Sequence, residues 1–539
     1  MVVVTCDAMI LRLLLAFCLG IPALAQTTAD NTKPGSAASA DAKASEADPL
    51  VSAQALLKKG EYADAATAFK SIVEKSPTLA EAQAGLVRSL LRARNFDEAE
   101  EAGKKAVAAV PTSALVHAAF GDVNFRMGKF AEAEAEYRGA LKADPNSAWG
   151  WLGMGRMFDM VSMHKKAKDA FAKAHELDPE NKQIFEEWLD TLSYAERLEQ
   201  VKKSAGEHPT EREQARIRIL SAVAQKKPWV LVGEISPTEI KMMPYGRTLA
   251  GISTGDKEGA APISKGYALD VKFNDRAGAV LLLDTGAGGI VIGRKLAEKA
   301  GVVKIADSYL GGIGDQGLVQ GYVGWVEKIR IGNIEFKDCL VRVSSRNDVA
   351  DESGLIGTDV FEKFLVTLDF KEWKMLLAPL PKNPSASGSE DDPQDRYIAP
   401  EMQSYTKIWR FNHDLVIPVL ISDKAMGNFV LDTGASINIV TPKLAQQVTK
   451  LSYEGYTMKG VSGTVKQVLN GDKAILQFAK MRVRSDDIPV IDISNISNSE
   501  GTEIAGFIGI RTLTQMKMTI DYRDGLVNLE VYDFKKARE

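Results

Sequence analysis

The sequence contains little cysteine and little histidine, which excludes several kinds of site. Only three of the 539 residues are cysteines, and two of them, Cys6 and Cys18, stand in the apolar N-terminal segment. If that segment is removed on export, Cys339 remains alone, so we expect neither an intramolecular disulfide nor a cysteine-ligated metal cluster. The five histidines show no metal-ligand spacing. We therefore expect no metal and no cofactor, and we interpret Cys339, in the strand-like IEFKDCLVRV, as a core residue.

Excess charge and long apolar runs are also scarce. The formal net charge of −4 gives no reason to expect a nucleic-acid partner or a polybasic membrane surface. Residues 1–25 have the features of a secretory signal peptide, because Arg12 precedes the apolar LLLAFCLGI and Ala23-Leu24-Ala25 offers a small-residue cleavage site. No later stretch is long and apolar enough to span a membrane. We expect an exported protein, periplasmic or extracellular, with no integral membrane segment after signal cleavage.

A regular repeat follows a segment, residues 26–45, whose Ala/Ser/Thr/Asp-rich composition predicts a disordered linker. Prolines recur at equal intervals, and an alanine precedes each by twelve positions: Pro77, Pro111, Pro145 and Pro179 follow Ala65, Ala99, Ala133 and Ala167. Small residues let paired helices approach closely, and proline ends one helix before the next begins. The interval, about 34 residues, resembles that of the tetratricopeptide repeat (TPR). The resemblance implies an all-α solenoid, with four repeats over roughly residues 46–180.

The helical pattern continues to residue 226 and then changes. Residues 181–226 either cap the solenoid or form an incomplete fifth repeat, so the predicted solenoid with its capping helices spans residues 46–226. From Trp229 the sequence is β-like. We call residues 227–380 lobe 1 and residues 396–539 lobe 2; a Pro/Ser/acidic linker, residues 381–395, joins them. Residues 235–264 carry turn signals that fit a lid, a linker or strands of lobe 1.

The two lobes repeat one set of motifs at matched distances. LLLDTGAGG in lobe 1 corresponds to FVLDTGASI in lobe 2, and each ends an apolar strand with an aspartate, Asp284 or Asp432. A glycine-containing segment begins at the same offset from the aspartate in both lobes, and an apolar-apolar-Gly segment ends at Gly357 or Gly509, at nearly the same offset. A buried strand-end carboxylate is costly unless it is hydrogen-bonded, paired or used. The second half is therefore interpreted as a duplicate of the first.

This arrangement resembles the retropepsin-like, gag-type aspartic peptidases, whose subunit has an Asp-Thr-Gly-Ala catalytic turn, a glycine-rich flap hairpin and a later apolar-apolar-Gly segment. The resemblance implies an all-β aspartic-peptidase fold made of two homologous lobes, with Asp284 and Asp432 as one catalytic dyad. It assigns support of the dyad to Thr285, Gly286, Thr433 and Gly434, with the threonines bonded across the lobe junction. It assigns substrate-binding flap positions to Gly312, Ile313, Gly314, Gly460, Val461, Ser462 and Gly463. Gly288 and Arg511 depart from the family pattern.

The predicted function is that of an exported aspartic endopeptidase. A water molecule between Asp284 and Asp432 would attack a peptide bond of an extended substrate, and the TPR region would recruit a protein partner or a substrate. One alternative is a catalytically weak or inactive peptide-binding module in which the TPR scaffold does the main work. Another is that each lobe pairs with a lobe of a second chain, so that the dyad forms between molecules.

Overall fold

The computed structural model describes residues 48–245, 266–312, 318–345, 354–384, 392–453, 458–460, 463–465 and 468–532. The predicted signal peptide and the predicted linker of residues 26–45 lie outside this part of the chain. The described residues fall into two compact units, divided between Met154 and Gly155. No helix within the described ranges is long and apolar enough to cross a membrane.

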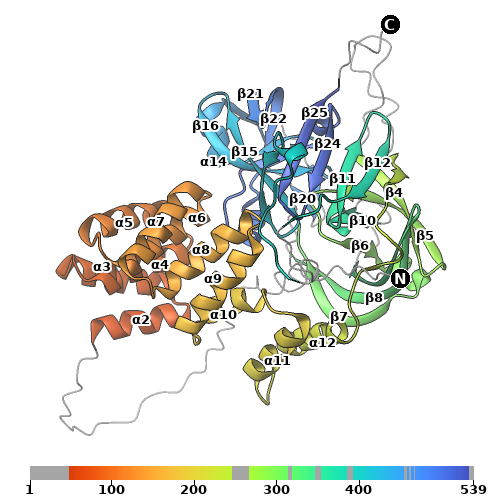
Figure 1. The fold of residues 1–539 in the computed structure, drawn as a ribbon. Coiled ribbons are helices and arrows are strands. Elements are labelled where there is room, and N and C mark those ends of the chain that lie inside the picture. The colour runs from red at the N-terminus through yellow and green to blue at the C-terminus, as the bar shows by residue number, and fades with distance from the viewer. Residues whose placement is uncertain are drawn as a thin grey trace, which may run out of the picture. The chain divides into compact units, whose positions relative to one another are not determined.

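The first unit consists of antiparallel helix pairs that keep the period of the sequence repeat (Figure 1). The pairs are α2 (Pro49–Lys59) with α3 (Tyr62–Lys75), α4 (Ala80–Arg92) with α5 (Phe96–Ala109), and α6 (Ala114–Arg126) with α7 (Phe130–Ala143), followed by the start of α8 (Ala148–Met160). Ala65, Ala99 and Ala133 are fully buried. The Phe69 ring packs so closely on Gly85 that a Cβ there would lie 2.4 Å from it. Small residues thus allow the close helix crossings that the sequence predicted.

The second unit begins with the remaining helices, which lead into lobe 1. They are the end of α8, then α9 (His164–Leu177), α10 (Lys182–Leu189), α11 (Tyr194–Ala205) and α12 (Glu211–Gln225). Helix α10 starts one repeat length after α8 but has 8 residues instead of 13. Leu189, Ile219 and Leu220 belong to the same hydrophobic core as Trp229 and the strands of lobe 1. Helices α10 and α12 therefore bury apolar residues against lobe 1.

Lobe 1 contains a nine-stranded sheet that curls into a barrel-like form. Its strands are β1 (Val230–Leu231), β3 (Met243–Tyr245), β4 (Gly266–Phe273), β5 (Ala277–Asp284), β6 (Ile290–Gly293), β7 (Val303–Leu310), β8 (Val319–Ile331), β9 (Ile334–Ser344) and β10 (Gly354–Gly357), with α13 (Arg294–Ala300) after β6. The order is β1-β9-β6-β10-β5-β4-β8-β7, with β3 beside β4, and β9 also pairs with β8. Within residues 235–264, strands β2 (Thr238–Lys241) and β3 belong to lobe 1, and residues 246–264 lie outside the described residues.

Lobe 2 contains an eight-stranded sheet of corresponding order (Figure 1). Its strands are β14 (Trp409–Phe411), β15 (Asp414–Ile421), β16 (Ala425–Asp432), β17 (Ile439–Val440), β18 (Leu451–Tyr453), β21 (Leu469–Phe478), β22 (Met481–Val490) and β23 (Gly506–Gly509). It also holds α14 (Pro442–Val448), α15 (Ser494–Ser499), α16 (Ile510–Leu513) and the small hairpin β19 (Met458–Gly460) with β20 (Gly463–Val465). The path β22-β17-β23-β16-β15 repeats β9-β6-β10-β5-β4 of lobe 1.

A third sheet of six strands joins the two lobes. Its order is β13 (Thr406–Lys407), β25 (Leu526–Val531), β24 (Met516–Asp521), β11 (Phe364–Asp369), β12 (Lys374–Pro379) and β2. Strands β11 and β24 are antiparallel, and Thr367 stands opposite Thr519 with their Oγ1 atoms 3.0 Å apart. Each threonine lies two residues before the aspartate that ends its strand, so each strand meets its own counterpart in register. Corresponding positions of the two strands therefore stand opposite each other.

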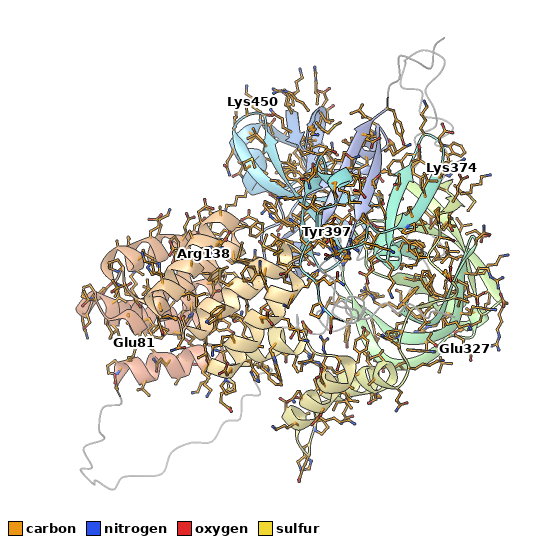
Figure 2. The ribbon with its side chains drawn as sticks, viewed as in Figure 1. Glu81, Arg138, Glu327, Lys374, Tyr397 and Lys450 are labelled. Carbon is orange, nitrogen blue, oxygen red and sulfur yellow. The ribbon has the colours of Figure 1, made fainter. Side chains whose placement is uncertain are left out.

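Polar contacts hold the two edges of this sheet. At one edge Lys374, labelled in Figure 2, forms an ion pair of 3.0 Å with Glu239 of β2. Near the other, the N–H of Tyr397 donates to Asp524 Oδ1 at 2.8 Å (Figure 2). Just before Tyr397, the end of the linker is held by helix α9, because the His164 N–H donates to the Gln394 carbonyl at 3.1 Å. Residues 385–391 of the linker lie outside the described part.

Candidate active site

Asp284 and Asp432 occupy equivalent positions at the ends of β5 and β16. Asp284 stands opposite Gly357 in the parallel pair β5–β10, and Asp432 stands opposite Gly509 in the parallel pair β16–β23. A Cβ on Gly357 would lie 2.3 Å from the Ala287 carbonyl, and one on Gly509 would lie 2.4 Å from a carbonyl of the other turn. Both positions therefore require glycine, because the Asp-Thr-Gly turn folds back directly over them.

The threonines of the two turns bond to each other across the lobe junction. The Thr285 N–H donates to Thr433 Oγ1 at 3.0 Å, and the Thr433 N–H donates to Thr285 Oγ1 at 2.9 Å. Each hydroxyl in turn donates to the opposite strand, Thr285 to the Leu431 carbonyl at 2.6 Å and Thr433 to the Leu283 carbonyl at 2.9 Å. Both side chains are buried. Four reciprocal bonds thus fix the two turns face to face.

Each glycine of the turns lies against the carboxyl group of the other lobe. A Cβ on Gly286 would stand 2.8 Å from Cγ of Asp432, and one on Gly434 would stand 2.4 Å from Cγ of Asp284. The two carboxyl groups share a hydrogen bond. The structure therefore brings together the six residues predicted for the dyad and its support, and it does so within one chain.

The two carboxyl groups have unequal surroundings. Asp284 accepts the N–H of Gly286 in its own turn at 2.8 Å and a backbone hydrogen bond from Gly434 of the other turn. Asp432 Oδ1 accepts two N–H groups of its own turn, from Gly434 at 2.8 Å and Ala435 at 2.9 Å. Burial, the charge of Asp432 and their shared hydrogen bond raise the pKa of Asp284 well above its usual range. Burial also raises the pKa of Asp432, but hydrogen bonds from Asp284 and the two amides lower it. These directions favour the shared proton on Asp284 over Asp432, and the two carboxyl groups titrate as one coupled pair.

A histidine of lobe 2 contacts the lobe 1 turn, and sequence reasoning did not identify it. His413 Nε2 lies 3.1 Å from the Gly286 carbonyl and 3.3 Å from Asp414 Oδ1. Burial lowers the pKa of His413 to about 3, so the ring is neutral and its Nε2–H donates to Gly286. Burial raises the pKa of Asp414 well above its usual range, with further contributions from Glu500 and both dyad aspartates. The available signal was position alone, in the turn between β14 and β15, one strand before the strand β16 that ends at Asp432.

The segment behind each turn is braced by different residues. In lobe 1 both Asp359 oxygens accept the Gly289 N–H, at 2.9 and 3.0 Å, and Arg342 Nη2 donates to the Gly288 carbonyl at 2.9 Å. Burial raises the pKa of Asp359 to about 7, although the Gly289 N–H lowers it. In lobe 2 the corresponding position is Arg511, which lies exposed on α16. The Arg511 charge is therefore exposed to solvent, on the helix that follows Gly509.

Three of the predicted flap positions, Gly312, Gly460 and Gly463, fall within the described residues, at or beside hairpins. Strands β7 and β8 form a hairpin whose last described pair is Leu310↔Val319, and Gly312 follows β7. The Gly312 carbonyl accepts a hydrogen bond from Asn495 Nδ2 of lobe 2 at 2.7 Å. In lobe 2, Gly460 stands opposite Gly463 at the end of the β19–β20 hairpin. The remaining predicted flap residues, Ile313, Gly314, Val461 and Ser462, lie outside the described residues.

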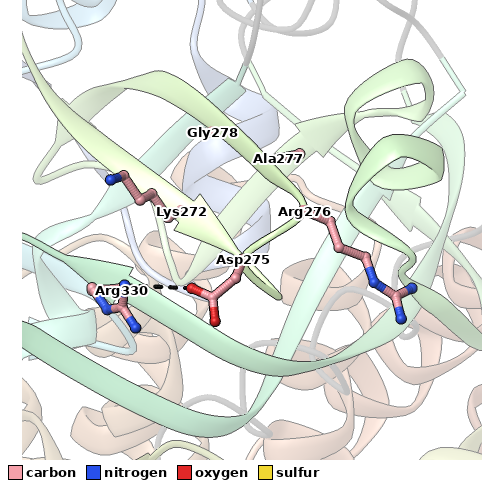
Figure 3. Close-up of a pocket in the computed structure, with 6 residues that line it drawn as sticks. All are labelled: Lys272, Asp275, Arg276, Ala277, Gly278 and Arg330. Carbon is pink, nitrogen blue, oxygen red and sulfur yellow. Dashed lines mark ion pairs between the residues drawn. The ribbon is translucent and has the colours of Figure 1, made fainter.

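A pocket of about 320 Å³ lies beside the β4–β5 turn (Figure 3). It is lined by residues of the β4–β5 turn and by Arg330, and Asp275 there forms an ion pair with Arg330. This turn is at the start of β5, whereas Asp284 is at its end, about 20 Å away at the usual rise of a strand. The pocket is therefore separate from the dyad. Across the described residues, no group of three or more His, Cys, Asp or Glu side chains is placed to hold a metal ion.

Comparison with known proteins separates the chain into two regions. Residues 269–363 match the family model described as gag-polyprotein putative aspartyl protease, and residues 50–114 and 119–159 match the tetratricopeptide repeat model. The first match includes Asp284 and Gly357, whereas Asp432 lies outside it. Among curated proteins, no match to this sequence was found.

Solved structures with some similarity include examples of both types. A thermophilic TPR protein of Thermus thermophilus has 21% identity, with 32% of this chain and 97% of that chain covered and a TM-score of 0.28. An aspartic proteinase from Irpex lacteus has 11% identity, 56% and 99% coverage and a TM-score of 0.33. The pilF protein of Pseudomonas aeruginosa has 19% identity, 33% and 83% coverage and a TM-score of 0.27.

The domain content of this protein follows from observations that agree with one another: the residue patterns, the helix pairs, the Asp-Thr-Gly geometry and the family models. The chain contains a gag-type aspartyl protease domain at residues 269–363, preceded by tetratricopeptide repeats at residues 50–159.

Proposed function

We propose that this protein is an aspartic endopeptidase whose dyad, Asp284 and Asp432, is formed by the two lobes of one chain. The observation that carries the proposal is the pair of carboxyl groups held opposite each other by the reciprocal Thr285–Thr433 bonds. In this proposal the lobes are duplicates of one subunit, as the corresponding strand orders and the register of β11 with β24 support.

The unequal surroundings of the dyad define the role of each carboxyl. Asp432, ionised, accepts a proton from a water molecule as the water oxygen attacks the peptide carbonyl carbon, and Asp284 donates its proton to the carbonyl oxygen. When the tetrahedral intermediate collapses, the C–N bond breaks, Asp432 returns its proton to the leaving amine, and Asp284 recovers a proton from the hydroxyl. One water molecule is consumed, and both carboxyl groups return to their starting states.

The substrate of this reaction is an extended peptide or protein segment. Each lobe carries a hairpin, β7–β8 in lobe 1 and β19–β20 in lobe 2, and an extended chain lying between them and the dyad would bond through its main chain. Specificity would then come from side-chain pockets on alternate sides. This binding mode requires no charge of one sign on the substrate.

The proposal also assigns roles to the helical repeats and to the N-terminal segment. We assign the TPR region the recruitment of a protein partner or a protein substrate, and we assign residues 1–25 the role of an export signal. Deletion of residues 48–154 should leave cleavage of a short peptide nearly unchanged and slow cleavage of a folded protein substrate. Equal slowing of both would contradict recruitment. Fractionation of cells that express the full chain, with N-terminal sequencing, tests export and cleavage after Ala25.

The decisive test of the chemistry uses single amide variants. Asp284→Asn and Asp432→Asn should each abolish cleavage of a mixed peptide library, because turnover needs one charged and one protonated carboxyl. Asp270→Asn, an exposed aspartate on the adjacent strand β4, is the matched control and should keep full activity. Activity regained on mixing the two inactive variants would show that lobes pair between chains. A wild-type protein that binds extended peptides without cleaving them at any pH would instead be a binding module.

A further inference from the structure

The β14–β15 hairpin carries His413 from lobe 2 to the lobe 1 turn. Phe411 pairs with Asp414, which leaves Asn412 and His413 as the turn residues, and Asn412 adopts a left-handed φ of 54°. His413 is only 8% exposed although it lies in a turn, and its Nε2 reaches the Gly286 carbonyl 127 residues away. Its Nδ1 is buried with no hydrogen-bond partner among the described residues. The whole interaction of this ring with the turn is thus its Nε2–H bond.

That bond fixes a peptide unit next to the dyad. The Gly286 carbonyl and the Ala287 N–H belong to one planar trans peptide and point in opposite directions. Holding the carbonyl toward His413 therefore also fixes where the N–H points. In lobe 2 the equivalent N–H, that of Ala435, donates to Asp432 Oδ1 at 2.9 Å. In lobe 1, among the described hydrogen bonds, only the Gly286 N–H of the turn donates to Asp284.

We propose that His413 is a positioning residue that locks the Gly286–Ala287 peptide with its N–H turned away from Asp284, so that Asp284 keeps the proton of the dyad and Asp432 carries the charge. The catalytic meaning of this assignment rests on the proposed function, but the location of the proton does not. His413 touches neither a reacting atom nor the substrate; it acts through the backbone of the turn.

Other charged groups surround this bond and determine the conditions of the test. Those that face the ring, the turn or the neighbouring Asp414 are Asp284, Asp432, Asp414, Glu500, Asp359, Arg342 and Arg410. Burial raises the pKa values of Glu500 and Asp359 to about 7. Both groups therefore gain charge as the pH approaches neutrality, which would obscure the titration of the dyad. Measurements between about pH 3.5 and pH 6.5 keep both mostly neutral.

Replacement of the ring removes the lock without changing the carboxyl groups. In His413→Phe the peptide is free to turn, the Ala287 N–H can donate to Asp284, and the lobe 1 turn then resembles that of lobe 2. A donated N–H favours the ionised carboxyl, so we expect the proton of the dyad to be lost about one pH unit lower. His413→Gln retains an N–H donor and should restore the wild-type titration. His208→Phe, at an exposed histidine, is the control and should shift nothing.

The titration can be read without any turnover. Urea unfolding across this pH range is compared for the wild type and His413→Phe, each with and without Asp284→Asn, so that the difference within each pair isolates the proton linked to Asp284. The expected result is a midpoint of that difference about one unit lower in the His413→Phe background than in the wild type. If His413→Phe does not fold, His413→Asn, whose shorter side chain holds its donor farther from Gly286, replaces it.

Two outcomes overturn the inference. The first is an unchanged midpoint together with a general loss of stability, which would make His413 a packing residue only. The second is a midpoint in His413→Gln that is lowered as far as in His413→Phe, because the hydrogen bond would then not be the cause. A failure of the proposed function looks different: the wild type would cleave no peptide at any pH while the midpoint still moved. Where cleavage is observed, the upper limb of the pH–kcat profile should fall about one unit earlier in His413→Phe, with KM little changed.

Discussion

Lobe 1 and lobe 2 present the same turn to the dyad but support it with different residues. Behind the lobe 1 turn, the Gly357 N–H donates to the Gly289 carbonyl at 2.7 Å, and the side chain of Asp359 holds the Gly289 N–H. Behind the lobe 2 turn, the Gly509 N–H donates to Asn438 Oδ1 at 3.0 Å instead. The N–H of the late glycine is thus accepted by a main-chain carbonyl in lobe 1 and by a side-chain amide in lobe 2, and in lobe 1 a buried carboxyl holds the segment that supplies that carbonyl.

The comparison distinguishes the residues that the site requires in both lobes from those that it requires in only one. Two carboxyl groups must meet at hydrogen-bond distance, so their threonines and glycines occur in both lobes. An acid and a base, however, must differ, and identical surroundings would give them equal proton affinities. The supporting residues that differ, such as His413 on one side only, supply that difference. Each of the following predictions tests one element of this comparison.

The largest effect is expected from a methyl group at the dyad glycines. In Gly434→Ala the new Cβ would lie 2.4 Å from Asp284 Cγ, and in Gly286→Ala it would lie 2.8 Å from Asp432 Cγ. Either change must displace a carboxyl, so peptide cleavage should fall about a hundredfold or more, and further for Gly434→Ala. Gly278→Ala on β5, where the nearest atom would be 3.8 Å away, is the control. Retained activity in either dyad variant, measured as kcat/KM, would show that the turns are looser than described.

The cross-bonded threonines should behave alike, because their contacts are reciprocal. Thr285→Val or Thr433→Val leaves a buried N–H and a buried carbonyl without partners, which costs about 2–4 kcal/mol of unfolding free energy. Urea unfolding at pH 5 measures this loss. Thr519→Val, at the less buried pair on the joining sheet, should cost less. A large loss for one dyad threonine only would mean that a single lobe holds the junction.

Asp369 and Asp521 end equivalent strands and should titrate in opposite directions. Burial alone would raise the pKa of Asp369, but Lys517 and the Tyr532 hydroxyl bond to it and lower that pKa overall. Burial and the charge of Asp524 raise the pKa of Asp521 to about 6. The two strands explain the difference: Lys517 pairs with Asp369 at 2.8 Å, whereas the residue opposite Asp521 is the apolar Leu365.

The signs follow from proton linkage. A lowered native pKa stabilises the fold above the unfolded pKa near 4, so Asp369→Asn should lose stability at pH 7 and little at pH 3. A raised native pKa stabilises below that value, and the contribution is lost as the pH rises through 6. Asp521→Asn should therefore flatten the fall in stability between pH 4 and pH 7, by roughly 1–3 kcal/mol. Parallel pH profiles for the two variants, from urea unfolding, would contradict the contrast.

The smallest effect is expected from Lys517→Leu. This change places a leucine beside Asp369, as Leu365 stands opposite Asp521. The ammonium group is partly exposed, with 35% of its side chain accessible, so its loss should cost about 1 kcal/mol at pH 7. The cost should shrink as the pH falls through the lowered pKa of Asp369, and it should also shrink in high salt. Thermal unfolding at two salt concentrations checks this, with Lys371→Leu as an exposed-lysine control.

Local patterns predicted the backbone of this protein well. The regular spacing of prolines and alanines predicted helix pairs, and the second helices do begin at equal intervals, at Tyr62, Phe96, Phe130 and His164. The matched offsets from Asp284 and Asp432 predicted which later glycine lies under each turn. These features repeat along the chain, so their spacing carries the information.

The one-sided contacts could not be predicted in this way. His413 and Gly286 are 127 residues apart and have no duplicate, and Arg342 and Gly288 are 54 apart within lobe 1. Neither pair leaves a period in the sequence, and a histidine in a turn ordinarily indicates a solvated side chain. The hold of α9 on the end of the linker is also non-local, because it joins His164 to Gln394.

The pairing of β11 with β24 determines how assembly of the dyad depends on protein concentration. Two separate chains with this surface would close a symmetric dimer whose population depends on their concentration. Here residues 381–395 tether the two strands, so the partner of each lobe is always present at an effective concentration on the order of millimolar. The dyad should therefore stay assembled however dilute the protein becomes, and its activity per molecule should be independent of enzyme concentration.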